Sequence, residues 1–208
     1  MMYDGKCRRT DRMQECKSGN DLILAEYNTL RQELLNNIDA MNQLYMFAFT
    51  TVSAIYLLAY YNTKPDFYLT AYVILILTRC RILYYHEMTL RISEYIIVFI
   101  EKEHLELSWE TMASKKYKLT PRTSLASVLA EVQYFSFTII AVMTFLMYWY
   151  ISGQNLSLNI QNTLSILAII IVGALDCKMR FGESKRRRIY KRQWNESKYL
   201  SRKNRSIH

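Results

Sequence analysis

Glycine and proline are scarce in this sequence, with 5 Gly and 2 Pro among 208 residues. So few glycines leave no phosphate-cradling loop, and the chain contains no Walker loop and no GxGxxG, GxSxG or HExxH motif. The 3 His and 4 Cys follow no spacing that is typical of a metal site. We therefore expect no enzymatic activity, no catalytic residue, no cofactor and no metal.

The apolar residues, in contrast, are gathered into four long blocks. A bilayer core of about 30 Å needs roughly 20 apolar helical residues, and the blocks at 43–61, 67–85, 130–152 and 158–177 approach that length. The second block carries Arg79 and Arg81 in its last two turns, where long side chains can extend to the headgroups. The sequence predicts an all-α integral membrane protein with four transmembrane helices.

The positive charges predict the orientation of these helices, because short loops rich in Lys and Arg stay in the cytoplasm. Of the 27 Lys and Arg residues, only Lys64 lies in the two turns that join the first to the second block and the third to the fourth. We therefore expect a multi-pass protein with the N-terminal head, the central loop, the tail and both termini in the cytoplasm.

Six parts follow from these boundaries. They are a flexible N-terminus (1–20), a juxtamembrane cytoplasmic helix (21–42), transmembrane helices 1 and 2 (43–85), a cytoplasmic loop domain (86–129), transmembrane helices 3 and 4 (130–177) and a basic cytoplasmic tail (178–208). The loop is too long for a simple turn, so we expect it to form a small cytoplasmic domain with the head. Its first part continues as a helix from Glu87, and Leu105, Leu107 and Trp109 alternate as in a strand or an irregular packed segment. The alternative is a helix that lies flat at the headgroups.

The juxtamembrane segment carries one apolar stripe at helical spacing. Asn20 or Asp21 can cap its start, and no Gly or Pro interrupts it before Pro65, so the helix is expected to run on into the first span. Its near-heptad spacing suits a seam between subunits, and packing against the same chain is the alternative. The seam candidates are Tyr27, Leu30, Leu34 and Ile38.

The tail accounts for all of the excess positive charge, with twelve Lys and Arg against Glu183 and Glu196. Interleaved basic and aromatic residues suit phosphate pairing combined with stacking on nucleobases. The same composition suits anionic lipid, which is the interpretation that the sequence favours. The candidate residues for oligonucleotide or anionic lipid are Lys185, Arg186, Arg187, Arg188, Lys191, Arg192 and Trp194.

Polar and small residues at helical spacing within the last two spans are candidates for a pore lining. In a symmetric oligomer, Asp176 or Glu131 would repeat as a ring that favours cations. The alternatives are that the small residues permit close helix packing and that Asp176 is a hydrated residue paired with Lys178 or Arg180. The candidates are Asn162, Ser165, Gly173, Asp176, Glu131 and Thr138.

Two further segments carry a family resemblance. The sequence EYNTLRQELLNNI at 26–38, together with RISEYIIVFIE at 91–101 and SWE at 108–110, resembles small membrane proteins of bacterial anti-phage defence operons, most closely the Hailong-type membrane effectors. The resemblance implies a homo-oligomeric channel in the bacterial inner membrane. Its cytoplasmic region would bind a nucleotide-derived signal, such as a short DNA oligomer from a partner nucleotidyltransferase. A non-conducting scaffold or sensor subunit that tethers a soluble partner is the alternative.

Overall fold

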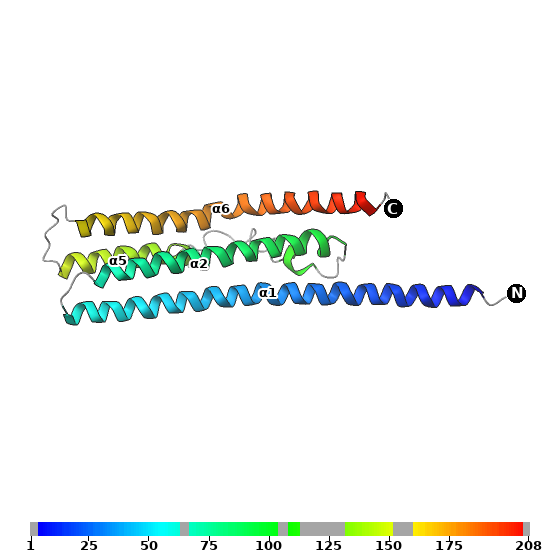
Figure 1. Ribbon diagram of the computed structural model, residues 1–208, viewed down its shortest axis with the longest axis horizontal. Helices are drawn as coiled ribbons and strands as arrows, with labels where there is room; N and C mark the ends of the chain where they lie inside the picture. The colour runs from blue at the N-terminus through cyan, green and yellow to red at the C-terminus, as the bar shows by residue number, and fades with distance from the viewer. Residues whose placement is uncertain (1–3, 63–66, 104–107, 113–131, 152–159, 206–208) are drawn as a thin grey trace.

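The computed structural model describes the backbone of residues 4–62, 67–103, 108–112, 132–151 and 160–205, and the side chains from residue 21 onward except at 151, 201, 202, 204 and 205. Every element in these ranges is helical, which confirms the all-α prediction. Four long helices lie alongside one another, and both chain termini are at the same end of the molecule (Figure 1).

The first helix, α1 (Asp4–Asn62), is a single helix that contains both the juxtamembrane segment and the first apolar block. Its continuity agrees with the absence of Gly and Pro between Asp21 and Pro65. The predicted start at Asn20 or Asp21 is wrong, because the helical backbone begins at Asp4.

The second helix, α2 (Phe67–Tyr95), lies in the middle of the bundle and contacts α1, α5 and α6. It continues directly into a six-residue π-helical segment, η1 (Ile96–Glu101). The predicted helical continuation beyond Glu87 is therefore confirmed. Trp109 lies in a helical turn at 109–112, not in a strand, while Leu105 and Leu107 are outside the described residues.

The last two helices are α5 (Ser136–Ile151) and α6 (Ile160–Arg205). Among the described residues, the helices within Asp21–Asn62, Phe67–Glu101 and Ile160–Leu200 are long and apolar enough to cross a membrane, and Ser136–Tyr150 is a shorter apolar helix. Three membrane-length helices are thus present where the sequence predicts four spans. The basic tail does not separate from the fold, because α6 extends through it to Arg205.

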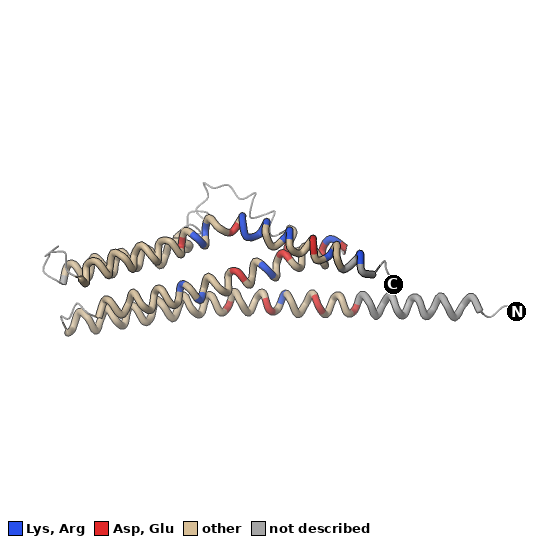
Figure 2. Tube along the Cα trace, turned by 45° about the horizontal axis from the view of Figure 1, so that its top comes forward, with Lys and Arg blue, Asp and Glu red and all other residues tan. Residues whose placement is uncertain are grey.

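Charge divides the bundle along its length (Figure 2). In the half that we call the apolar end, one core joins all four long helices through small and branched side chains such as Ala48, Ala71, Ala141 and Val172. Its outer surface is also apolar, with Phe47, Leu57, Val73 and Ile170 among many exposed side chains. An exposed hydrocarbon surface of this extent is unusual for a protein in water and suits lipid.

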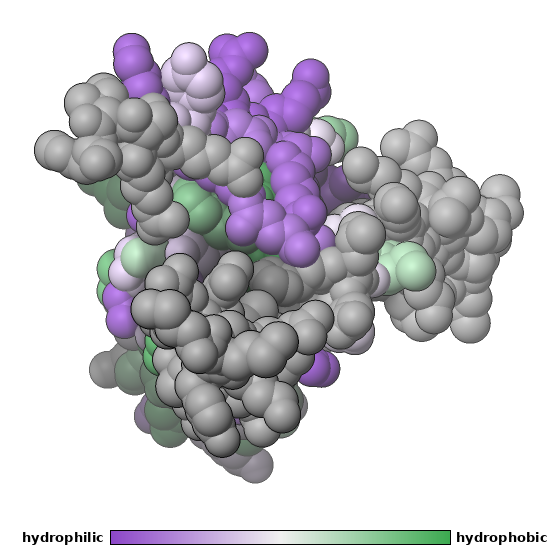
Figure 3. All heavy atoms as spheres, turned by 90° about the vertical axis from the view of Figure 1, so that its right-hand side faces the viewer, coloured by the Kyte–Doolittle hydropathy of each residue, from purple (hydrophilic) through white to green (hydrophobic). Residues whose placement is uncertain are grey.

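The other half, which we call the charged end, contains residues 21–42 of α1, residues 86–95 of α2, η1, the turn at 109–112 and residues 178–205 of α6. Viewed from this end, the hydrophilic side chains gather at the top of the molecule, over α6 (Figure 3). The helices α1, α2 and α6 run through both halves without a break.

Candidate functional site

A buried ion pair joins α2 to α6 in the part of the apolar end that adjoins the charged end. Arg79 Nε lies 2.5 Å from Asp176 Oδ1, and neither side chain is exposed to solvent. The contact is an ion pair, and the two atoms are not aligned as a hydrogen bond. At 1.5 Å per residue, Arg79 lies about 18 Å along α2 from Phe67, and Asp176 lies about 24 Å along α6 from Ile160. Both charges therefore fall within a hydrocarbon layer of about 30 Å if these helices span it.

Neighbouring groups satisfy the remaining polar atoms of this pair. Arg79 Nη1 donates to the hydroxyl of Tyr45 on α1 at 3.0 Å, and Nη2 donates to the Tyr134 carbonyl at 3.0 Å. Asp176 Oδ2 accepts from the backbone N–H of Thr138 on α5 at 3.0 Å and from its hydroxyl at 2.6 Å. Polar contacts through this one pair thus connect α1, α2, α5 and α6.

The energetic role of such a pair is asymmetric. Burying two charges costs several kcal/mol each, and their attraction offsets this only with good geometry and satisfied hydrogen bonds. Removing one partner leaves a buried, unpaired charge and costs about 3–5 kcal/mol. Ionisable groups at membrane depth are rare and usually mark a functional site.

The pairing corrects two expectations for this region. Arg79 does not extend to the headgroups, because its side chain is fully buried against Asp176 and lies over the Phe137 ring. Asp176 is neither hydrated nor paired with Lys178 or Arg180, since its side chain is also fully buried and its ion-pair partner is Arg79. Arg81, in contrast, is exposed as expected.

Most of the other pore-lining candidates lie among the described residues. Ser165 is buried, and a Cβ on Gly173 would lie 3.8 Å from Thr138 Oγ1, so Gly173 and Thr138 belong to the α5–α6 contact next to the ion pair. Asn162 is half-buried near the start of α6, and Glu131 lies outside the described residues. The cluster of Gly173, Thr138 and Asp176 and the buried Ser165 therefore pack within the single chain, and a lining shared between copies stays a prediction.

At the charged end, the stripe on α1 faces its own chain. Tyr27 is buried in a cluster with Ile96 and Ile100 of η1, and Leu30 packs at its edge. Leu34 is buried and Ile38 half-buried. These contacts favour the intrachain alternative for the stripe, and the subunit seam has no support from them.

The turn at 109–112 is held against η1 by a buried carboxylate. Glu101 Oε1 accepts from the backbone N–H of Glu110 at 2.6 Å, and Glu101 Oε2 accepts from the N–H of Thr111 at 2.8 Å. Ser93 donates to Glu110 Oε2 at 2.8 Å. Burial, with a further contribution from the nearby Glu101 charge, raises the pKa of Glu110 above its usual value near 4.5.

The tail residues divide into two groups, of which the first docks onto α2. Trp194 Nε1 donates to the Arg91 carbonyl at 3.3 Å, and the indole meets the rings of Tyr95 and Phe99 edge-on. Arg187 pairs with Glu94 at 3.4 Å. These side chains hold the second half of α6 in the fold.

Arg186 belongs to the same group, and its side chain extends back along α6 to carbonyls seven and eight residues earlier in the helix. Its Nη1 donates to the Lys178 carbonyl at 3.1 Å and its Nη2 to the Met179 carbonyl at 3.2 Å. Gly182 permits this approach, because a Cβ there would lie 2.7 Å from Arg186 Nη1. Nη1 also lies 3.7 Å from Glu87 Oε1 on α2.

The second group is exposed and forms what we call the basic stripe, Lys185, Arg188, Lys191 and Arg192. At 100° per residue these four positions fall within about one third of the circumference of α6. Phe181, at 73% exposed, adjoins the stripe, whereas Trp194 is directed toward α2. In the tail motif, the basic side chains of the stripe are therefore exposed to solvent, whereas the Trp194 ring packs against the rest of the fold.

The segments that carry the family resemblance contact one another at the charged end. Tyr95 donates to Glu26 at 2.8 Å, and the Arg31 guanidinium lies 4.8 Å from the centroid of the Trp109 ring. Comparisons with protein-family models, curated proteins and solved structures found no match for this chain.

Proposed function

We propose that the chain is a membrane effector of bacterial anti-phage defence that assembles into an oligomeric channel or pore and is gated by an anionic, nucleotide-derived signal. The observation that carries the proposal is the Arg79–Asp176 pair, a charged contact at membrane depth that is connected to all four long helices. In this proposal the pair holds the closed arrangement, and the charged end lies in the cytoplasm.

The signal acts through α6. The basic stripe lies on the same continuous helix as Asp176. Ligand binding at the stripe that displaces this part of α6 therefore acts on the ion pair. Trp194 and Arg187 hold this half of α6 on α2, and release of that docking is the step that separates Asp176 from Arg79. Channel opening then follows from the rearrangement of α5 and α6 once the pair is broken.

The position of the stripe supports a soluble polyanion as its ligand. Arg188 and Arg192 lie about 16 and 22 Å beyond Cys177 along the helix axis. Charges interact over only about 8 Å at physiological ionic strength. The sequence alone favours anionic lipid for these residues, but a helix that continues away from the bilayer carries the stripe beyond the headgroups.

Ion flux from vesicles containing the full chain tests this proposal. We expect short DNA oligonucleotides to start flux from wild-type protein, and Arg188→Gln with Arg192→Gln to raise the concentration required by at least about tenfold, because each cation pairs with a phosphate. Asn28→Asp with Asn36→Asp is the matched control, since it lowers the net charge equally on the exposed face of α1. Equal sensitivity of both double variants would contradict a signal site on α6.

A non-conducting membrane scaffold is the second candidate, and the outer surface of the apolar end favours it. The exposed side chains there are mostly apolar, and the Thr50 and Ser53 hydroxyls donate to carbonyls of their own helix. Oligonucleotide binding without flux, from protein that is folded and inserted, would support the scaffold over the channel.

A further inference from the structure

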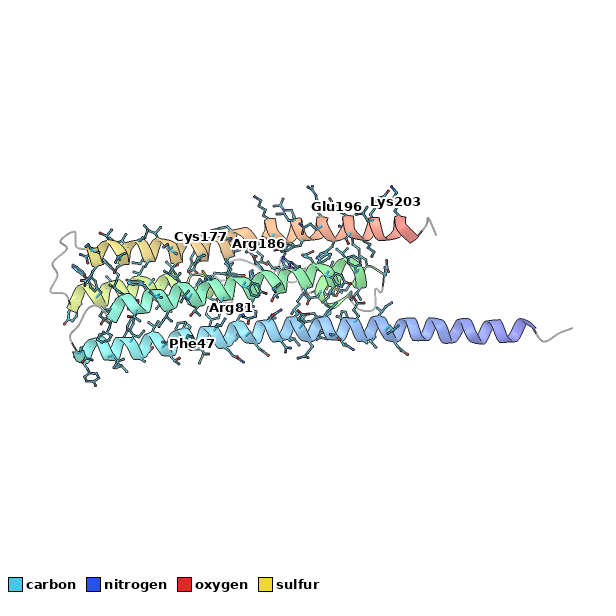
Figure 4. All side chains as sticks on the ribbon, in the orientation of Figure 1. Phe47, Arg81, Cys177, Arg186, Glu196 and Lys203 are labelled. Atoms are coloured by element: carbon cyan, nitrogen blue, oxygen red, sulfur yellow. The ribbon has the colours of Figure 1, made fainter. Side chains whose placement is uncertain are left out.

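A groove between α1 and α2 lies beside the boundary of the apolar and charged ends. It has a volume of about 320 Å³ and is lined by Ala40, Gln43, Leu44 and Phe47 of α1 and by Arg81 and Tyr85 of α2. Figure 4 labels Phe47 and Arg81, which lie on adjoining stretches of the two helices. The groove is separate from the Arg79–Asp176 pair and from the basic stripe.

The depth of the groove matches the inner edge of a bilayer. Gln43 lies about 28 Å along α1 from Asn62, and Tyr85 lies about 27 Å along α2 from Phe67. Phe47 and Arg81 lie about 22 and 21 Å from the same ends. A hydrocarbon layer of about 30 Å therefore places Phe47 among acyl chains and places Gln43 and Tyr85 next to the headgroups.

The Arg81 side chain is directed toward the headgroup side of the groove. Its Nη2 donates to the hydroxyl of Tyr85, one turn further along α2, at 3.1 Å. The guanidinium also lies 5.2 Å from the Tyr84 ring centroid and 4.9 Å from that of Tyr85. These contacts hold a planar cation in place, and its fork of N–H donors matches the geometry of a phosphate.

The groove thus combines a cation with an apolar wall. Arg81 is the one Lys or Arg among the lining residues, and the exposed Gln43 amide adds a neutral donor. Phe47, at 55% exposed, supplies hydrocarbon contact on the bilayer side, and Leu44 adds apolar surface beside Gln43. One cation suits a singly charged phosphodiester better than the doubly charged phosphate at the end of a nucleotide.

We propose that this groove binds an anionic phospholipid, with Arg81 on the headgroup phosphate and the part of an acyl chain nearest the headgroup against Phe47. The site anchors α1 and α2 to the inner leaflet at a fixed depth. It stands apart from the signal site on α6, so either proposal can fail without the other.

Native mass spectrometry of the full chain tests the site. We expect one molecule of phosphatidylglycerol to bind about fivefold more tightly than phosphatidylcholine, the preference expected of one cation near a membrane surface. Arg81→Gln should abolish the preference, while Phe47→Ala should lower the binding affinity for both lipids equally. Lys178→Gln should leave the preference unchanged, because it removes a cation of α6 that is exposed near the same depth but is not in the groove.

Three results would overturn the proposal. They are equal binding of the two lipids by the wild-type chain, retention of the preference in Arg81→Gln, and displacement of bound phosphatidylglycerol by millimolar AMP, which would assign the groove to a soluble phosphate. Arg81→Lys is the second variant if Arg81→Gln does not fold. It keeps the charge but loses the fork of donors, so we expect it to retain less than half of the preference.

Discussion

Asp176 on α6 accepts hydrogen bonds from Thr138 through one carboxylate oxygen and faces Arg79 on α2 with the other. The two contacts join three helices through side chains that are fully buried or partly buried in the chain. We therefore expect a movement of α6 either to break the pair or to carry α2 and α5 with it.

The first prediction concerns the stability of this contact. Arg79→Met alone and Asp176→Leu alone should each lower the free energy of unfolding by about 3–5 kcal/mol, because each leaves an unpaired buried charge. The double variant should recover most of that loss, since two apolar side chains of similar size remain. Denaturant unfolding in detergent micelles measures all three, and additive losses in the double variant would mean that the pair is not coupled.

The second prediction concerns the docking of α6 on α2. Trp194→Ala should speed hydrogen exchange of amides in residues 186–200 by about tenfold, which corresponds to roughly 1.4 kcal/mol from two lost ring contacts. Exchange in 160–177 should not change. Gln193→Ala is the matched control, because this neighbouring side chain is exposed. Equal effects of the two substitutions would remove Trp194 as the docking residue.

The third prediction uses the raised pKa of Glu110. Because the folded chain binds this proton more tightly than the unfolded chain, lowering the pH through the raised pKa should stabilise the fold, and the gain is complete below about 4.5. Relative to Glu110→Gln, the wild-type melting temperature should therefore rise as the pH falls from 8. A parallel pH dependence of the two proteins would show that Glu110 does not titrate in this range.

The fourth prediction concerns orientation, which rests on the distribution of Lys and Arg in the sequence. In a chain without native cysteines, Cys introduced at Asn62 or Gln154 should react with an impermeant reagent added to intact cells. Cys at Ser114 should react only after lysis. Labelling of Ser114→Cys from outside would reverse the assignment of the charged end to the cytoplasm.

Part of the fold was predictable because it depends on local features. The unbroken α1 follows from the lack of Gly and Pro after Asp21, and the continuation of α2 beyond Glu87 follows from its amphipathic spacing. The path of the tail was not predictable in the same way. Its high positive charge suggested a separate segment, yet Glu87, Glu94 and Glu103 supply partners for Arg186, Arg187 and Lys198 across the fold.

The sequence shows Arg79 and Asp176 in two different apolar blocks, but helical periodicity alone could not predict that they pair. An Arg and an Asp occupy the inner turns of two different apolar blocks, at depths where each could reach either the headgroups or the other. The choice depends on which helices are neighbours and on their rotation, and these are properties of the tertiary packing.

The most direct test of the account is the ionic current carried by the full chain in planar bilayers without any added signal. If the Arg79–Asp176 pair holds the closed arrangement, Asp176→Asn should conduct spontaneously, because it weakens the hold on Arg79. The double variant Arg79→Met with Asp176→Leu should stay closed, because two packed apolar side chains replace the contact and leave no unpaired buried charge. Spontaneous current from wild type, or no current from Asp176→Asn in protein shown to be folded and inserted, would contradict the account.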